Sequence, residues 1–290
     1  MRDHWCAKSF PCQRGQGTLA CMAHPAQPDP ADLLPTVCLP GLRLHAVTRA
    51  QCVEFVMAEL AAGRGGALVT PNLDHLRRLQ RDAGFRAVYD GARLHVADGM
   101  PLVWAAWLQG TPLPERVAGS DLTHDLAAGL ARSGRRLFLL GGDPGTAEAA
   151  GRMLVAAHPG LVVAGTACPA PGFERDPAAM QALRDALVAA HPDLVYVALG
   201  SPKQERLVHE LKPLLPCAWW VGVGISFSFV TGAVRRAPRW MRACGLEWVH
   251  RLAQEPRRLA RRYLVDGIPF ALRLLPACLV RRVRGRTQAT

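Results

Sequence analysis

The chain has 290 residues, a formal net charge of +12 at pH 7, 50% hydrophobic residues and 6% aromatic residues. This composition is sufficient for a large apolar core and excludes an intrinsically disordered or collagen-like protein. The excess of basic residues is typical of proteins that bind nucleic acid, anionic lipid or a diphosphate, and charge alone does not choose among these partners.

The N-terminal region is predicted to be a leader without fixed structure. Residues 1–40 contain six prolines and no hydrophobic period, so we expect them to be mostly disordered. The start of the chain also lacks the apolar segment of a signal peptide. Nine cysteines, an odd number without a C-x-x-C pair, favour free thiols in a reducing cytoplasm over a zinc site or a disulfide framework.

From Leu42 onward, short apolar runs that are typical of strands alternate with helical stretches. The predicted strands are Leu42–Ala46, Ala67–Thr70, Leu94–Ala97, Leu137–Leu140, Leu161–Thr166, Leu194–Leu199 and Ala218–Val223. The predicted helices are Arg49–Ala62, Asn72–Asp82, Pro101–Gln109, Asp121–Arg132, Thr146–His158, Ala178–His191 and Pro202–Leu211. Apolar strands between amphipathic helices indicate a parallel sheet that is covered on both faces. We therefore predict that residues 41–232 form one doubly wound α/β domain.

The pattern changes beyond this predicted domain. Residues 235–262 contain nine arginines, no lysine and two acidic residues, and they predict a basic helical appendage over residues 233–290. The apolar run Leu264–Val280 is interrupted by two charged residues and two prolines. This run is therefore expected to lie on a bilayer and is a poor candidate to cross one.

Ligands of parallel α/β sheets bind beyond the carboxyl ends of the strands, which singles out five loops. These loops span residues 70–74, 97–101, 141–145, 200–205 and 222–224. Asp98 follows an apolar strand, where partial desolvation raises the pKa of a carboxyl group and makes it a better general base. The alternative is that Asp98 caps the helix that begins near Pro101. Thr70 and Asn72 either bind a ligand or cap the next helix, and both roles can coexist.

Glycine-rich turns place Gly142, Gly200 and Gly224 at the predicted ligand edge, where glycine lets the backbone approach a phosphate closely. None of these turns matches a dinucleotide-binding fingerprint or a P-loop. Lys203 and Gln204 begin a helix after one of the turns and are predicted to contact a nucleotide. The alternative for Lys203 is a solvated surface side chain.

Arginines are the predicted counter-charges for a diphosphate. The chain has no D-x-D triplet to hold a divalent cation, so no metal site is expected and guanidinium groups must offset the charge. Arg116 lies in a loop between helices, where it either faces the cleft or is solvated. The other candidates are Arg235, Arg236 and Arg239.

Eight stretches within residues 41–265 together carry a family resemblance. They are Val69–Asn72, Ala97–Met100, Leu113–Asp121, Leu139–Gly142, Ala198–Glu205, Val234–Trp240, Gly245–Trp248 and Arg251–Arg262. In sequence and order these stretches resemble the WecG/TagA/CpsF family, glycosyltransferase family 26. A co-linear match of this length is far more specific than any single glycine-rich loop.

The resemblance implies the fold and the activity of this family. It implies a Rossmann-like, mostly parallel sheet and a metal-independent, inverting transferase without a cofactor. The implied reaction moves N-acetylmannosamine or a related hexose from a UDP-sugar to an undecaprenyl-diphosphate-linked sugar, for teichoic acid, common antigen or exopolysaccharide synthesis. The appendage is implied to close over the site and to rest on an anionic membrane at its cytoplasmic face. It governs oligomerisation in some relatives, so a homo-oligomer is a further expectation.

Matched position by position, the resemblance also assigns roles to residues. Asp98 matches the catalytic base, and Thr70 and Asn72 match polar groups of the active site. Arg116 and Gln204 match cleft residues near the nucleotide or the acceptor.

Two positions depart from the family pattern, and two other classes of protein stay open. Ile225 and Ser228 stand where relatives usually have a glycine and an aspartate, which puts the donor preference in doubt. A Rossmann-type enzyme with a nucleotide cofactor would need the missing glycine fingerprint. A nucleic-acid-binding module would use the arginine-rich appendage. However, the interleaved Trp240, Trp248 and Leu252 give an amphipathic layout that favours anionic lipid over nucleic acid.

Overall fold

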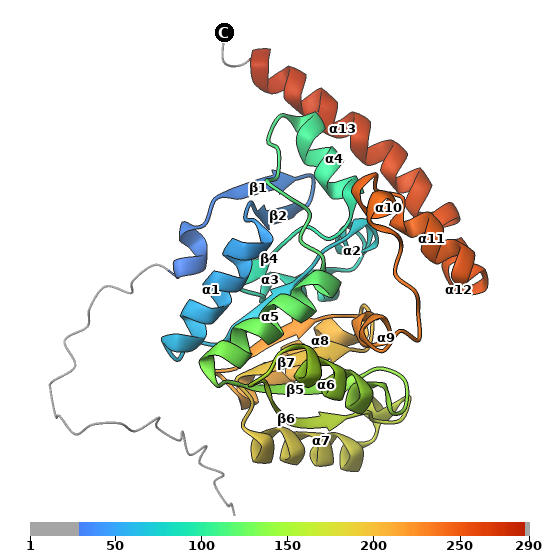
Figure 1. Cartoon of the computed structure of the whole chain (residues 1–290). Coiled ribbons are helices and arrows are strands. Elements are labelled where there is room, and N and C mark those ends of the chain that lie inside the picture. The colour runs from blue at the N-terminus through green and yellow to red at the C-terminus, as the bar shows by residue number, and fades with distance from the viewer. Residues whose placement is uncertain (1–28, 288–290) are drawn as a thin grey trace, which may run out of the picture. The chain divides into compact units, whose positions relative to one another are not determined.

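The structure, a computed structural model, describes residues 29–287 (Figure 1). By its internal contacts the chain forms two compact units, one that ends at Leu33 and one that begins at Leu34. The first unit includes the short 3-10 helix Pro30–Leu33. The second unit begins with a hairpin of two antiparallel strands, β1 (Thr36–Leu39) and β2 (Leu42–His45). The predicted end of the leader at residue 40 is therefore too late, because β1 has the alternating burial of a strand that is too short to show a hydrophobic period. The rest of the predicted leader, residues 1–28, lies outside the described residues.

Within residues 34–287, six strands form one all-parallel sheet in the order β4-β3-β8-β7-β5-β6 (Figure 1). They are β3 (Gly66–Val69), β4 (Leu94–His95), β5 (Arg136–Gly141), β6 (Val162–Ala167), β7 (Leu194–Ala198) and β8 (Trp219–Gly222). The central strands β7 and β8 pair in register from Leu194 opposite Trp219 to Val197 opposite Gly222. The predicted Rossmann-like α/β fold is confirmed. One predicted strand, Leu42–Ala46, pairs with β1 instead of joining this sheet.

Helices cover both faces of the sheet, as predicted. They are α1 (Arg49–Ala61), α5 (Gly119–Ser133), α6 (Thr146–Ala157), α7 (Pro177–Ala190) and α8 (Lys203–Leu211). Helices α1, α5 and α6 pack on the face where Leu194 and Tyr196 of β7 point. Helices α7 and α8 pack on the other face with Val195 and Val197. Because successive residues of the central strands β7 and β8 alternate between two buried faces, these strands are apolar throughout and ligands reach them only at their ends.

A third apolar cluster joins the β1–β2 hairpin to helices that follow the first strands of the sheet. These helices are α2 (Leu73–Leu79), α3 (Ala83–Asp90) and α4 (Met100–Gln109). Helix α3 is absent from the prediction, which continued one helix to Asp82. In the structure the Asp82 side chain accepts the backbone N–H of Phe85 at 2.8 Å, so this residue caps the start of a new helix.

The C-terminal region is helical, as predicted. Its helices are α9 (Ser226–Val230), α10 (Arg239–Ala243), α11 (Glu247–Gln254), α12 (Pro256–Ala260), the π-helix η4 (Arg261–Gly267) and α13 (Ile268–Thr287). Helix α13 packs along α4 (Figure 1) and buries Leu274 and Cys278. By length and composition alone, the helical stretch Pro256–Arg284 is apolar enough to cross a membrane, with a mean hydropathy of 1.5 and 11% of its most apolar window buried. The charged residues and prolines therefore interrupt this apolar helical stretch less than we expected from the sequence.

Candidate active site

A cavity of about 780 Å³ opens at the carboxyl edge of the sheet. Its walls combine the turns that follow the strands with appendage residues between Gly245 and Ala271. Of the residues predicted from the sequence, those that line it are Thr70, Asn72, Asp98, Arg116, Gly142, Gly200, Gln204 and Gly224. Ile225 and Ser228, which depart from the family pattern, line it as well. The rule that ligands bind beyond the carboxyl ends of parallel strands therefore located the part of this cavity that lies at the sheet edge, since each of the five predicted loops lines it.

The turns that carry Asn72 and Asp98 lie against each other. The Asp98 backbone N–H donates to the Pro71 carbonyl oxygen at 2.8 Å. A Cβ on Gly99, whose φ is +112°, would lie 3.6 Å from the Cβ of Asn72. The left-handed backbone at Gly99 thus turns the chain sharply after Asp98 and holds the two polar side chains at one end of the cavity.

The structure shows which of these two side chains caps a helix. Asn72 caps α2, because its Oδ1 accepts the N–H groups of Asp74 at 3.0 Å and His75 at 3.2 Å. It also lines the cavity, and its role in binding a ligand stays a prediction. Asp98 does not cap α4, whose N-cap is Gly99 without a side-chain hydrogen bond.

The Asp98 carboxylate is the group in the cavity that is suited to accept a proton. No hydrogen bond or ion pair with another of the described residues engages it. Burial raises the pKa of Asp98 to about 6, and the nearby Glu247 acts in the same direction, whereas Arg116 opposes the shift. At neutral pH the group is mostly ionised, and it is more basic than an ordinary aspartate.

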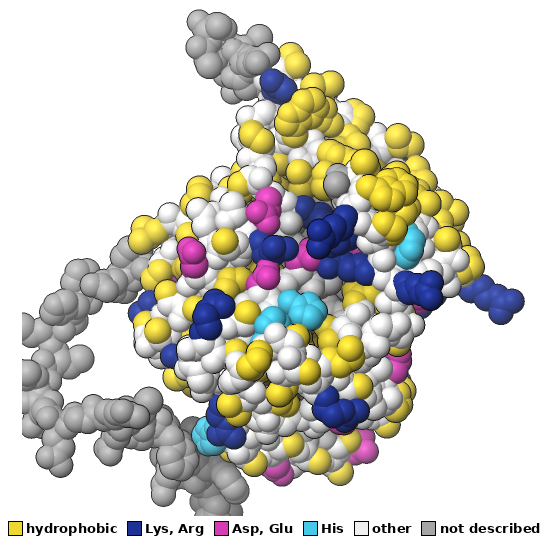
Figure 2. All heavy atoms as spheres, in the orientation of Figure 1, with side chains coloured by type: hydrophobic (Ala, Val, Ile, Leu, Met, Phe, Trp, Pro, Cys, Tyr) yellow, Lys and Arg dark blue, Asp and Glu magenta, His cyan; other side chains and the backbone are white. Residues whose placement is uncertain are grey.

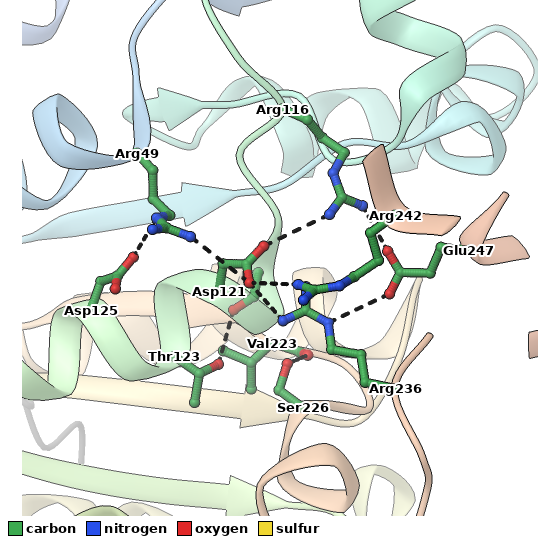
Figure 3. A network of polar contacts seen from close by, with 11 residues as sticks. Arg49, Arg116, Asp121, Thr123, Asp125, Val223, Ser226, Arg236, Arg242 and Glu247 are labelled. Carbon is green, nitrogen blue, oxygen red and sulfur yellow. Dashed lines mark hydrogen bonds and ion pairs between the residues drawn. The ribbon is translucent and has the colours of Figure 1, made fainter. Parts of the chain in front are cut away.

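A network of ion pairs joins the appendage to the sheet domain beside the cavity (Figure 3). Asp121, in the first turn of α5, lies 2.6 Å from Arg236 and 3.6 Å from Arg242. Glu247, which begins α11, accepts from Arg116 at 2.7 Å. Burial would raise the pKa of Asp121, but the hydrogen bond and charge of Arg236 outweigh it and hold that pKa below its usual range. Asp121 is therefore an ionised partner of the arginines around it, and Glu247 is paired with Arg116.

Four predicted contact residues are not brought to the cavity. Arg235 and Arg239 are exposed, and neither lines it. Arg236 points into the ion-pair network instead. The Lys203 side chain is 56% exposed and pairs with Glu174 at 3.0 Å. Lys203 is therefore a surface side chain, which was the alternative to nucleotide contact. A basic sequence pattern does not identify which arginines face inward, because that depends on how the appendage packs.

The appendage instead supplies residues to the cavity that the sequence interpretation missed. They are Glu247, Trp248, Arg251, Glu255, Arg258, Leu259, Arg262 and Tyr263. Most are three or four positions apart, the spacing of one helix face, and this periodicity is the signal that could have found them. Arg262 pairs with Asp74 at 3.3 Å. Among the described residues, Arg251 has no carboxylate partner, and its Nε is buried without a hydrogen bond.

Among residues 29–287, no group of three or more His, Cys, Asp or Glu side chains is placed to hold a metal ion. The cysteines in that part of the chain are all free. A metal-independent reaction stays a prediction that chemistry must test.

Comparison with known proteins shows the family of this chain. The family model described as "Glycosyl transferase WecG/TagA/CpsF family" matches residues 37–284, which include the whole cavity. The chain belongs to this family. This WecG/TagA/CpsF protein is therefore a glycosyltransferase, and the cofactor-enzyme and nucleic-acid alternatives are not needed to explain the cavity.

Two relatives of the glycosyltransferase share the name N-acetylglucosaminyldiphosphoundecaprenol N-acetyl-beta-D-mannosaminyltransferase. One, from Bacillus subtilis strain 168, is 29% identical over 197 residues, which cover 68% of this chain and 75% of the relative. The other, from Bacillus spizizenii strain ATCC 23059 / NRRL B-14472 / W23, is 32% identical over 202 residues, covering 70% of this chain and 76% of the relative.

The surface of the glycosyltransferase carries an apolar face near the cavity. Figure 2 shows hydrophobic side chains gathered over the region of α4 and α13. In these elements Trp107 of α4 is 62% exposed and Leu272 of α13 is 69% exposed, and Val265 of the adjoining η4 is 65% exposed. Trp104 of α4 and Ile268 of α13 belong both to the exposed apolar residues and to the cavity lining, so the cavity is continuous with this face.

Proposed function

We propose that this glycosyltransferase moves N-acetylmannosamine or a related hexose from a UDP-sugar to an undecaprenyl-diphosphate-linked sugar. The relatives are named for transfer of N-acetylmannosamine to N-acetylglucosaminyldiphosphoundecaprenol, which supports this class of acceptor. The observation that carries the proposal is the Asp98 carboxylate. Its raised pKa, its place beside Asn72 and the guanidinium groups of Arg116 and Arg251 in the same cavity fit transfer from a diphosphate leaving group.

In the proposed reaction Asp98 removes the proton of an acceptor hydroxyl. The hydroxyl oxygen attacks the anomeric carbon as the bond from that carbon to the diphosphate oxygen breaks, and the electron pair leaves with UDP. Attack opposite the leaving group inverts the configuration. A positioned base contributes about 10²–10⁴-fold to the rate. Thr70 and Asn72 line the same end of the cavity and are proposed to orient the sugar hydroxyl groups.

The leaving diphosphate is proposed to be neutralised by arginine without a bound cation. Arg251 lines the cavity and has no carboxylate partner among the described residues, so its charge is available to an anionic ligand. Arg116 also lines the cavity but is paired with Glu247, and a diphosphate would exchange with that carboxylate. The glycine turns at Gly142, Gly200 and Gly224 let the backbone approach the phosphates.

We also propose that the enzyme works on the cytoplasmic face of the membrane as a peripheral protein. The apolar face of α4 and α13 adjoins the cavity, and the net charge of the chain favours anionic lipid. A lipid-linked acceptor would thus present its sugar to the cavity while its hydrocarbon stays in the bilayer. Homo-oligomerisation and the absence of a nucleic-acid partner stay predictions.

A donor screen tests this function directly. The full-length enzyme is incubated with a short-chain polyprenyl-diphosphate N-acetylglucosamine acceptor and, in turn, UDP-N-acetylmannosamine, UDP-N-acetylglucosamine and UDP-glucose. Mass spectrometry reads the product, and we expect addition of one sugar from the preferred donor. Ile225 and Ser228 line the cavity and are proposed to bear on this preference. Lack of transfer from every UDP-sugar would contradict the proposed function.

A further inference from the structure

Three side chains form a hydrogen-bonded chain at and behind the cavity wall. His75 Nε2 lies 3.3 Å from Glu205 Oε1, and the same oxygen accepts a hydrogen bond from Gln204 Nε2 at 2.9 Å. All three residues are buried, with no more than 7% exposed. His75 and Gln204 line the large cavity, whereas Glu205 does not. The carboxylate therefore acts on the cavity only through its two neighbours.

Chemistry fixes the direction of each of these hydrogen bonds. The backbone N–H of Asn72 donates to His75 Nδ1 at 3.3 Å, so the ring proton is on Nε2 and is donated to Glu205. Burial raises the pKa of Glu205, but the hydrogen bonds that it accepts from His75 and Gln204 hold that pKa below its usual range. The ionised Glu205 can only accept hydrogen bonds.

It follows that the Gln204 amide has one favourable orientation. Its NH₂ group must face Glu205, since two acceptor oxygens facing each other would repel. The end of β8 confines the amide as well, because a Cβ on Gly222 would lie 2.6 Å from Gln204 Nε2. Gln204 Oε1 is left as a buried acceptor that has no hydrogen-bond partner within the described part of the chain. A buried carbonyl oxygen of this kind is costly to leave unpaired.

We infer that Glu205, oriented by His75, is a positioning residue that holds the Gln204 NH₂ group and thereby leaves the Gln204 carbonyl oxygen as the acceptor for an N–H or O–H group of the bound nucleotide sugar. This inference rests on the proposed function, because it takes the cavity to hold a nucleotide sugar. The donated hydrogen comes either from the imide of the base or from an amide or hydroxyl group of the sugar. An amide that was free to rotate would offer NH₂ as readily as C=O and would not select a donor.

Glu205→Gln tests the inference, because a glutamine at 205 can donate as well as accept and releases the Gln204 amide. Titration calorimetry of the full-length protein measures Kd for UDP and for UDP-N-acetylmannosamine. We expect about tenfold weaker binding. Weakening of both ligands assigns the hydrogen to the UDP part, and weakening of the UDP-sugar alone assigns it to the sugar. Glu210→Gln makes the same chemical change at an exposed position of the same helix and should leave both Kd values unchanged.

A double-mutant cycle separates positioning from general damage. Gln204→Met removes the acceptor at similar length and should by itself weaken binding about tenfold. In the Gln204→Met background, Glu205→Gln should add less than about twofold, because Glu205 acts through Gln204. A further tenfold loss in that background, or wild-type Kd values in Glu205→Gln, would overturn the inference.

Two further outcomes are distinguishable from these. If circular dichroism shows that Glu205→Gln does not fold, Gln204→Met alone carries the test, and unchanged binding by that variant rejects the inference. If the wild-type protein binds neither UDP nor UDP-N-acetylmannosamine, the proposed function fails, and the inference that depends on it fails with it.

Discussion

At the scale of the residue, Asp98 combines ionisation with a basicity above that of an ordinary aspartate. We predict that Asp98→Asn keeps the fold and the affinity for UDP but lowers turnover by about 10²–10⁴-fold, because asparagine cannot take the acceptor proton. Circular dichroism, UDP titration and transfer assays measure the three quantities. Turnover within threefold of wild type would reject Asp98 as the base.

The pH dependence follows from the pKa of the same group. Because the pKa of Asp98 is raised to about 6 and the base must be deprotonated, kcat/KM should rise with pH through about 6 and level off above it. Arg116 opposes this rise in pKa, so Arg116→Gln should move the acidic limb to higher pH. Arg184→Gln, a change at a distant ion pair with Glu210, serves as the control and should leave the limb in place. A limb that stays fixed in Arg116→Gln would contradict the assignment.

Arginine side chains give a second prediction at this scale. Arg251→Gln should weaken UDP binding about tenfold, since it removes a cavity charge that has no carboxylate partner among the described residues. Arg239→Gln removes an exposed arginine of the same appendage and should leave Kd unchanged. Calorimetry at two salt concentrations measures both variants. Equal effects from the two changes would show that binding responds to net charge alone.

At the scale of the element, the exposed face of α4 and α13 is predicted to bind anionic membranes. The double variant Trp107→Ser, Leu272→Ser should lower vesicle binding at least about fivefold, because both side chains are largely exposed and apolar. Flotation with anionic and zwitterionic vesicles measures it. Val162→Ser, Val188→Ser changes two exposed valines on β6 and α7 and provides the matched control. If the control loses as much binding, the face is not the membrane contact.

Elements also show how far the sequence could be interpreted. Strands buried on both faces are continuous apolar runs, and their positions were predicted to within a few residues. The polar side chains that follow β3 and β4, including Thr70 and Asp98, could be assigned to one edge because parallel strands end together. Helix α3 was missed because an internal cap at Asp82 looks like the end of one helix. Strand β1 was missed because it shows only four residues between prolines.

The appendage was harder to interpret because its packing partner is far away in sequence. Its arginines share one chemistry, and the sequence gives no reason to choose Arg251 over Arg235. Arg251 lines the cavity because the ion pairs Arg116–Glu247 and Arg236–Asp121 fix which face of α11 is turned toward it. Contacts between residues that are more than a hundred positions apart leave no local pattern in the sequence.

At the scale of the whole molecule, charge neutralisation by arginine predicts that the reaction needs no divalent cation. Dialysis against EDTA should leave the transfer rate within about twofold of the untreated enzyme, because guanidinium groups offset the diphosphate charge without a cation. Added Mg²⁺ or Mn²⁺ should not raise the rate of the dialysed protein. Loss of activity on chelation, with recovery on adding one of these ions, would contradict the metal-free mechanism.

The cavity takes its walls from residues as early as Thr70 and as late as Ala271. During synthesis the ribosome therefore completes Asp98, the turns at the carboxyl edge and the sheet well before the appendage residues that line the cavity exist. We therefore expect a nascent chain to lack the complete cavity, and with it transferase activity, until residues up to Ala271 have left the ribosome. Any premature stop codon upstream of 271 should likewise yield a folded but inactive fragment at best.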